Sequence, residues 1–209
     1  MDIDYTPTKT CSEFMSCDAK MRVLMGPVGS GKSVSSCFGV IRRASQQKVN
    51  AQGIRKSRVA IVRETARQLQ DTTIKTFLDW FPPGVCGRFM RTTKTFLFKV
   101  GEVECEIMFR ALDDADDVAN LNSLELTFAW FNECRDIHPD IINVLAVFHL
   151  LKMAGHHGLV CGVTLIPRLW ILGGTIKWKD LILKMELALT IMGGKYLNNH
   201  RGVVHTQRI

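Results

Sequence analysis

The chain has 209 residues, of which 46% are hydrophobic, and its 27 Lys and Arg against 20 Asp and Glu give a net charge of +7. This length and apolar content predict one domain, or one domain with an appendage, that can bury a core. The polar, acidic N-terminus does not resemble a secretory signal, and no apolar run reaches the roughly 18 residues that would predict a membrane span.

The basic charge is concentrated in the tail. Residues 1–145 carry 19 basic and 18 acidic side chains, whereas residues 146–209 carry 8 basic and only 2 acidic ones. In the first part, a local group of basic residues could contact DNA phosphates or could form a solvated helix face and loop. This group consists of Arg42, Arg43, Lys48, Arg55, Lys56 and Arg58.

The cysteines are seven, an odd number, and none forms a C-x-x-C pair. We interpret them as reduced packing residues of an intracellular protein, because neither a metal site nor a disulfide framework matches this spacing.

The first clear elements follow a leading segment, residues 1–20, that has no periodicity. Met21–Met25 is a short apolar run that predicts a strand, and Val34–Ala44 predicts a helix. The loop between them matches the phosphate-loop pattern G-x-x-x-x-G-K-S/T at every fixed position. The loop residues are Gly26, Pro27, Val28, Gly29, Ser30, Gly31, Lys32 and Ser33.

A loop between a strand and a helix places backbone N–H groups and a helix N-terminus around bound phosphates. Lys32 would reach the β- and γ-phosphates, and the Ser33 hydroxyl would bind Mg²⁺. ATP and Mg²⁺ are therefore the predicted cofactors. The alternative, a chance Gly- and Ser-rich turn, does not account for the order of strand, loop and helix.

Further elements follow the break at Gly53. Arg58–Arg63 predicts a strand and Thr72–Trp80 an amphipathic helix. Thr95–Val100 and Val103–Phe109 alternate in the manner of a hairpin.

A second motif lies at the end of an apolar run, Leu124–Phe131, which suits a strand of a parallel sheet buried on both faces. Such a strand usually ends in Asp-Glu in phosphate-loop ATPases, and here it ends in Asn132-Glu133. Asn132 keeps an oxygen acceptor without the charge, so its support of Mg²⁺ should be weaker. Glu133 is the candidate general base that polarises the attacking water. A buried strand that merely ends at a polar turn is the alternative.

These segments together resemble the large terminase subunit of tailed bacteriophages, the ATPase that pumps DNA into the capsid. The agreement in order and spacing covers about residues 12–145. It is carried by Met25–Ser33, Thr72–Pro82, Arg110–Asp117 and Ser123–Glu133.

The resemblance implies an α/β fold over residues 1–145, a P-loop NTPase of the additional-strand type with a mostly parallel central sheet flanked by helices. It implies that Lys32 and Glu133 are catalytic and that Ser33 and Asn132 hold the metal. Arg63 matches an Arg of the family pattern, with a role toward phosphate or in a structural ion pair.

The resemblance also implies the partners: double-stranded viral DNA, a portal protein, a small terminase subunit and further copies of the chain in a homo-oligomeric ring. It implies action in the host cell cytoplasm, transiently on the prohead and without a membrane, and a C-terminal metal-dependent nuclease domain.

Beyond Leu145 the resemblance ends, because the family segments D-T-N-P-P and W-W-Y are absent. A shifted reading frame could encode these segments. In that frame, each codon combines the third base of one residue's codon with the first two bases of the next residue's codon. Thr164–Arg168 then permits D-T-N-P-P, and Trp170–Ile176 permits M-D-T-W-W-Y-Y. We therefore interpret residues 146–209 as an out-of-frame translation, with a divergent genuine tail as the alternative. Residues 1–145 alone should lack a further parallel strand.

Three functions remain open at this point. The first is a DNA-packaging ATPase of which this chain is the N-terminal part. The second is a truncated, non-catalytic fragment that binds nucleotide. The third, a small-molecule phosphate-loop kinase, fits less well because the apolar strand ends in a Glu and the other segments resemble terminase.

Overall fold

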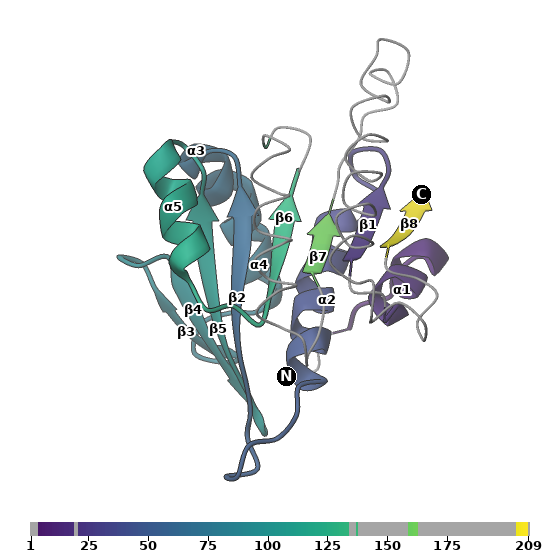
Figure 1. The fold of residues 1–209 in the computed structure, drawn as a ribbon. Coiled ribbons are helices and arrows are strands. Elements are labelled where there is room, and N and C mark those ends of the chain that lie inside the picture. The colour runs from purple at the N-terminus through teal and green to yellow at the C-terminus, as the bar shows by residue number, and fades with distance from the viewer. Residues whose placement is uncertain (1–3, 19–20, 134–136, 138–158, 163–203, 209) are drawn as a thin grey trace, which may run out of the picture.

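The structure is a computed structural model, and it describes residues 4–18, 21–133, 137, 159–162 and 204–208 (Figure 1). The helical elements are α1 (Lys9–Ser16), α2 (Lys32–Ser45), α3 (Ala66–Gln68), the π-helical η1 (Leu69–Ile74), α4 (Lys75–Trp80) and α5 (Ala115–Ser123). The strands are β1 (Met21–Met25), β2 (Arg55–Arg63), β3 (Gly87–Met90), β4 (Thr95–Val100), β5 (Val103–Ala111), β6 (Phe128–Asn132), β7 (Leu159–Gly162) and β8 (Val204–Arg208).

These strands form one sheet in the order β3-β4-β5-β2-β6-β7-β1-β8. Strands β5, β2, β6, β7, β1 and β8 pair in parallel, and β3, β4 and β5 pair antiparallel. The sheet is therefore mostly parallel, as predicted. The parallel part brings the carboxyl ends of β1, β2 and β6 to one edge, where α/β proteins bind ligands.

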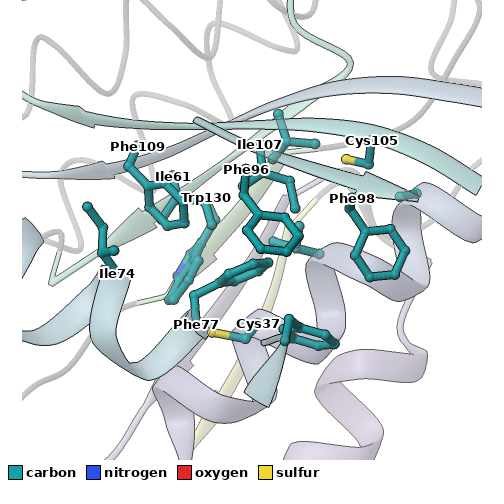
Figure 2. Close-up of a cluster of buried hydrophobic side chains, with 14 of the residues drawn as sticks. Cys37, Ile61, Ile74, Phe77, Phe96, Phe98, Cys105, Ile107, Phe109 and Trp130 are labelled. Carbon is teal, nitrogen blue, oxygen red and sulfur yellow. The ribbon is translucent and has the colours of Figure 1, made fainter. Parts of the chain in front are cut away.

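The core lies between the sheet and helices α2 and α4. Alternate residues of β2, β5 and β6 point to this face, as a strand period of two requires. The Phe77 ring of α4 packs against Phe96 and Phe109 with centroid distances of 5.4 and 5.5 Å. Figure 2 shows Phe77 directed toward the side chains of the strands, Trp130 among them. This packing fixes α4, and with it η1, against the sheet.

Most predicted elements are confirmed, with shifted bounds. Strand β1 has the predicted limits, α2 begins two residues early at Lys32, and the β4–β5 hairpin extends to Ala111. Strand β6 begins at Phe128 rather than Leu124, because the chain first meets β2 where Thr127 N donates to Arg58 O at 2.7 Å. The helix predicted from Thr72 begins earlier, at Ala66, and contains a π-helical segment.

The leading segment has regular structure although its sequence shows no clear periodicity. It contains helix α1, which is too short for periodicity to reveal. The Thr8 side chain caps this helix, and its Cys11 and Phe14 side chains are buried. The leading segment therefore contributes to the core.

The tail supplies a strand that residues 1–145 lack. Strand β7 pairs in parallel with β6 on one side and with β1 on the other. The two halves of the parallel sheet are thus joined by a strand from beyond residue 145.

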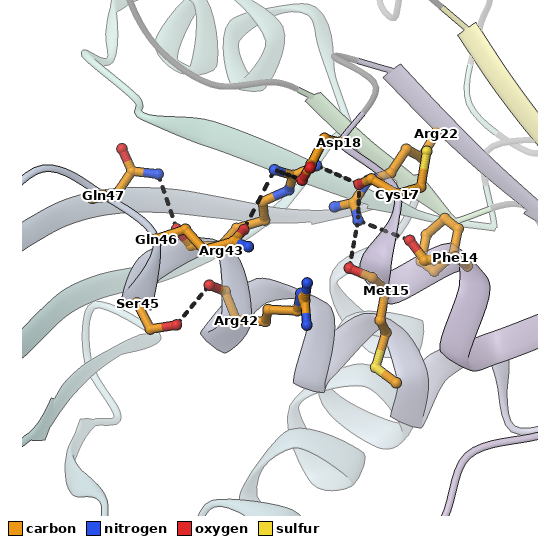
Figure 3. Close-up of polar contacts among 10 residues, drawn as sticks. All are labelled: Phe14, Met15, Cys17, Asp18, Arg22, Arg42, Arg43, Ser45, Gln46 and Gln47. Atoms are coloured by element: carbon orange, nitrogen blue, oxygen red, sulfur yellow. Dashed lines mark hydrogen bonds and ion pairs between the residues drawn. The ribbon is translucent and has the colours of Figure 1, made fainter. Parts of the chain in front are cut away.

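Arg22 of β1 is fully buried and holds the end of α1 (Figure 3). Its Nη1 donates to the carbonyls of Phe14, Met15 and Cys17 at 2.9, 3.4 and 3.3 Å. Burial, with the nearby charge of Arg43 as a second cause, lowers the pKa of Arg22 to about 9. The last carbonyls of a helix have no partner within it, and Arg22 satisfies those of Phe14 and Met15, whereas the Cys17 carbonyl also accepts from Arg43.

We expect Arg22→Leu to lower the free energy of unfolding by about 2–3 kcal/mol, because it leaves buried carbonyls unpaired. Urea unfolding followed by circular dichroism measures the change. The matched control is Arg42→Leu in α2, whose exposed side chain should matter by less than about 0.5 kcal/mol. Equal effects of the two variants would contradict this role of Arg22.

Candidate functional site

The loop between β1 and α2 has the conformation of a phosphate-binding loop. Gly29 and Gly31 have φ of 82° and 81°, in the left-handed region that glycine adopts without cost. Gly31 is also the N-cap of α2 and provides no side-chain hydrogen bond to the helix. The first-turn N–H groups of α2 therefore have no side-chain cap, the arrangement that suits a bound anion.

Lys32, the first residue of α2, is buried, with 7% of its surface exposed. Its Nζ donates to the Pro27 carbonyl and to Ser30 Oγ, the latter at 3.0 Å, so the ammonium group lies over its own loop. Burial lowers the pKa of Lys32, and the charge of Glu133 opposes this shift. Lys32 and Glu133 are therefore within electrostatic reach of each other.

The strand register explains how two motifs so far apart in the sequence meet. Gly162 of β7 pairs with Asn132 of β6 on one side and with Leu24 of β1 on the other. The end of β6 and the start of the phosphate loop are thus separated by a single strand. At about 4.8 Å per strand, this places them roughly 10 Å apart along one edge of the sheet.

Glu133 directly follows β6 and has an unusual backbone. Its φ is 57°; among the described residues only Lys94 is another non-glycine residue with positive φ. The side-chain oxygen Oε2 is buried and has no hydrogen-bond partner in the described part of the chain. A strained backbone with an unsatisfied carboxylate oxygen is typical of functional sites.

Asn132 is buried, and its Nδ2 donates to Thr73 Oγ1 of η1 at 2.9 Å. Ser33 is the second residue of α2 and is half-buried. A hydroxyl and an amide oxygen are hard ligands of the kind that Mg²⁺ accepts, and nucleotide phosphates and water complete such sites. The residues present therefore fit a nucleotide-bound Mg²⁺. No group of three His, Cys, Asp or Glu that could hold a metal occurs among the described residues.

Half of the basic group of residues 42–58 is engaged in side-chain contacts with the protein. Arg43 is buried and contacts Asp18 and the Cys17 carbonyl, at 3.3 and 2.6 Å. Arg55 pairs with Glu102 at 2.6 Å, and Arg58 with Glu106 at 2.7 Å. These three side chains have structural partners, which favours the interpretation as a protein face over a DNA contact.

Sequence reasoning missed Thr73, which contacts Asn132, and the segment that precedes α1. In that segment Tyr5 stacks on Phe38 of α2 with a centroid distance of 4.3 Å, and its hydroxyl lies 2.7 Å from Ser35 Oγ. A polar residue inside an apolar helix pattern was the only available signal for Thr73.

Arg63 ends β2, the strand that pairs with β6. Because the two strands are parallel, Arg63 lies at the same edge of the sheet as Asn132.

Comparison with known proteins identifies the family. Residues 18–156 match the family model of the phage terminase large subunit. The chain belongs to this family. The match extends past residue 145, where the resemblance in the sequence was expected to end. No curated protein matches the chain.

Solved terminases share the fold. The large terminase of a thermophilic bacteriophage has a TM-score of 0.68 and 10% identity over 98% of this chain and 46% of its own. The complex of that terminase with ATP-γ-S has a TM-score of 0.66 at 10% identity, and the match covers 98% of this chain and 45% of the terminase. The ATPase domain of the Thermus phage P74-26 large terminase has a TM-score of 0.54 and 16% identity, covering 77% and 66%. The chain therefore has the P-loop NTPase fold of terminase ATPase domains and spans less than half the length of the thermophilic phage protein.

None of the helices in the described part of the chain is long and apolar enough to cross a bilayer.

The left-handed backbone at Glu133 predicts a stability difference between two variants that both remove the charge. Glu133→Asn should be about 1 kcal/mol more stable than Glu133→Gln, because Asn adopts the left-handed region more readily. Thermal unfolding by calorimetry measures this difference, and the Gln variant controls for the lost carboxylate. Identical unfolding of the two variants would show that no strain resides at this position.

Proposed function

We propose that this chain is the N-terminal ATPase part of a phage DNA-packaging motor, which binds ATP with Mg²⁺ and hydrolyses it. The observation that carries the proposal is that the phosphate loop with Lys32 follows β1, Glu133 follows β6, and a single strand, β7, lies between β1 and β6 in a parallel sheet. The large terminase of the thermophilic phage, whose fold this chain shares, has been solved with ATP-γ-S, which supports ATP as the ligand.

In this proposal the loop residues Gly26–Ser33 surround the phosphates with backbone N–H groups. Lys32 moves from the loop carbonyl to the β- and γ-phosphates, and Ser33 and Asn132 hold the metal. A bound Mg²⁺ neutralises charge on the β- and γ-phosphates. Glu133 orients a water molecule in line with the γ-phosphate and accepts its proton, which its unsatisfied oxygen leaves it able to do.

Arg63 is proposed as a further contact to phosphate or as a structural partner of this edge. Its position at the end of β2, adjacent to β6, supports either role.

The proposed partners follow from the family. They are double-stranded viral DNA, a portal protein, a small terminase subunit and further copies of the chain in a ring, and the place of action is the host cell cytoplasm. Hydrolysis would then drive DNA into the prohead.

A second proposal concerns residues 146–209. We propose that they are translated out of frame and, as the alternative to the ATPase, that the 209-residue product is a nucleotide-binding fragment without turnover. The tail has 8 basic and 2 acidic residues, and its codons permit the missing family segments in a shifted frame.

Sequencing the gene across codons 140–150 and beyond codon 209 tests this second proposal. A frame change that restores D-T-N-P-P, followed by an open frame for a nuclease domain, would support it. An unbroken frame that encodes the tail as written would refute the frame change and would favour a nucleotide-binding fragment over a motor.

Two variants test the ATPase proposal on the purified chain. Lys32→Ala should weaken nucleotide binding by about 10- to 100-fold, because a charged hydrogen bond to phosphate is lost. Glu133→Gln should keep binding but slow hydrolysis by about 10²- to 10⁴-fold. Calorimetric titration with ADP and a phosphate-release assay, each with and without double-stranded DNA, measure the two effects.

The control for both variants is Lys99→Ala on β4, an exposed residue paired with Glu104. Undiminished hydrolysis in Glu133→Gln would refute the general base. Binding without hydrolysis in the unaltered chain would favour the fragment, and phosphoryl transfer to a small acceptor would favour a kinase.

A further inference from the structure

We propose that Thr73 is a positioning residue that orients the amide of Asn132 so that its oxygen faces the nucleotide-bound metal. This inference rests on the proposed function. It assigns a role in the nucleotide site to η1, an element that contains no nucleotide-binding motif.

The contact joins two buried side chains from distant parts of the chain. Thr73 is 1% exposed and Asn132 is 4% exposed, and the donor–acceptor distance is 2.9 Å across 59 positions of sequence. It is the only hydrogen bond of the Asn132 side chain within the described residues. A buried polar contact of this kind is strengthened by its low-dielectric surroundings and is costly to break.

The π-helical geometry of η1 directs Thr73 inward. Leu69 and Ile74, five positions apart, are 0% and 1% exposed, and Thr73 is buried beside them. The i→i+5 spacing of a π-helix places Leu69 and Ile74 on one face. An α-helix, with 3.6 residues per turn, would not align residues five positions apart. The apolar pair anchors the segment to the core, so the hydroxyl between them is held against the end of β6.

The Asn132 contact has a direction, because Asn132 Nδ2–H donates to Thr73 Oγ1 at 2.9 Å. The neighbouring Thr72 Oγ1 donates to the Gln68 carbonyl at 2.7 Å. The two threonine hydroxyls lie 3.5 Å apart, at the limit of a hydrogen bond in which either could donate. Because Nδ2 and Oδ1 are the two branches of one planar amide, Oδ1 is turned away from Thr73 and is the branch left for a cation.

An aspartate at this strand tip would need no such orientation, since both of its oxygens are equivalent acceptors. An asparagine has only one oxygen, and a rotated amide would present N–H groups to the metal. Groups that orient a metal ligand change metal affinity by about 10- to 100-fold when they are removed. Thr73 is therefore the residue that allows Asn132 to act as a metal ligand at a position where Asp is usual.

The test is a Mg²⁺ titration of the 209-residue chain with fluorescently labelled ADP, repeated in EDTA. The variants are Thr73→Val, which removes the hydroxyl at constant shape, and Thr73→Ser, which keeps it. Thr73→Val should raise the Mg²⁺ concentration for half-maximal binding by about tenfold and leave metal-free ADP binding unchanged. Thr73→Ser should stay within about twofold of the unaltered chain, because its hydroxyl still accepts from Asn132.

Three outcomes would overturn the proposal. An unchanged Mg²⁺ requirement in Thr73→Val would refute it and leave the proposed function intact. A matching loss of ADP affinity in EDTA would show that Thr73 acts on the fold alone. Failure of the unaltered chain to bind ADP at any Mg²⁺ concentration would refute the proposed function as well.

Discussion

The nucleotide site depends on one constraint, the common edge at which the parallel strands β1, β6 and β2 end. A single strand, β7, separates the start of the phosphate loop from the end of β6. This spacing brings Lys32 and Glu133 within electrostatic reach, and the lowering of the Lys32 pKa by burial is partly opposed by the Glu133 charge. If β6 shifted by one residue in register, its side chains would exchange faces and Glu133 would leave the site.

The aromatic core maintains that register from one side of the sheet. Phe77 of α4 packs on rings from β4 and β5, while η1, directly before α4, presents Thr73 to β6. Helix α2, which begins with Lys32, packs against the same core through Cys37 and Val40. The phosphate loop and the tip of β6 are thus held by a shared hydrophobic cluster. Because interiors are close-packed, a displacement at one of these elements strains the others.

The polar groups of the site lower the stability of the folded chain when no ligand is bound. Glu133 adopts a left-handed backbone with an unsatisfied carboxylate oxygen, and Lys32 is buried against its own loop. Such features persist only where the surrounding structure determines them, and here a fully buried strand and a packed helix do so.

Local patterns were enough to predict the phosphate loop, the strand that ends in Asn132-Glu133 and most elements between them, because the order of apolar residues and glycines specifies these directly. Such patterns did not reveal α1, whose eight residues are too few to show a period, or the π-helical turn in η1, which follows from packing. The position of Thr73 beside Asn132, and of β7 between β6 and β1, required the folded chain. Contacts between residues far apart in the chain depend on strand order and register, and these are set by long-range packing rather than by any local pattern.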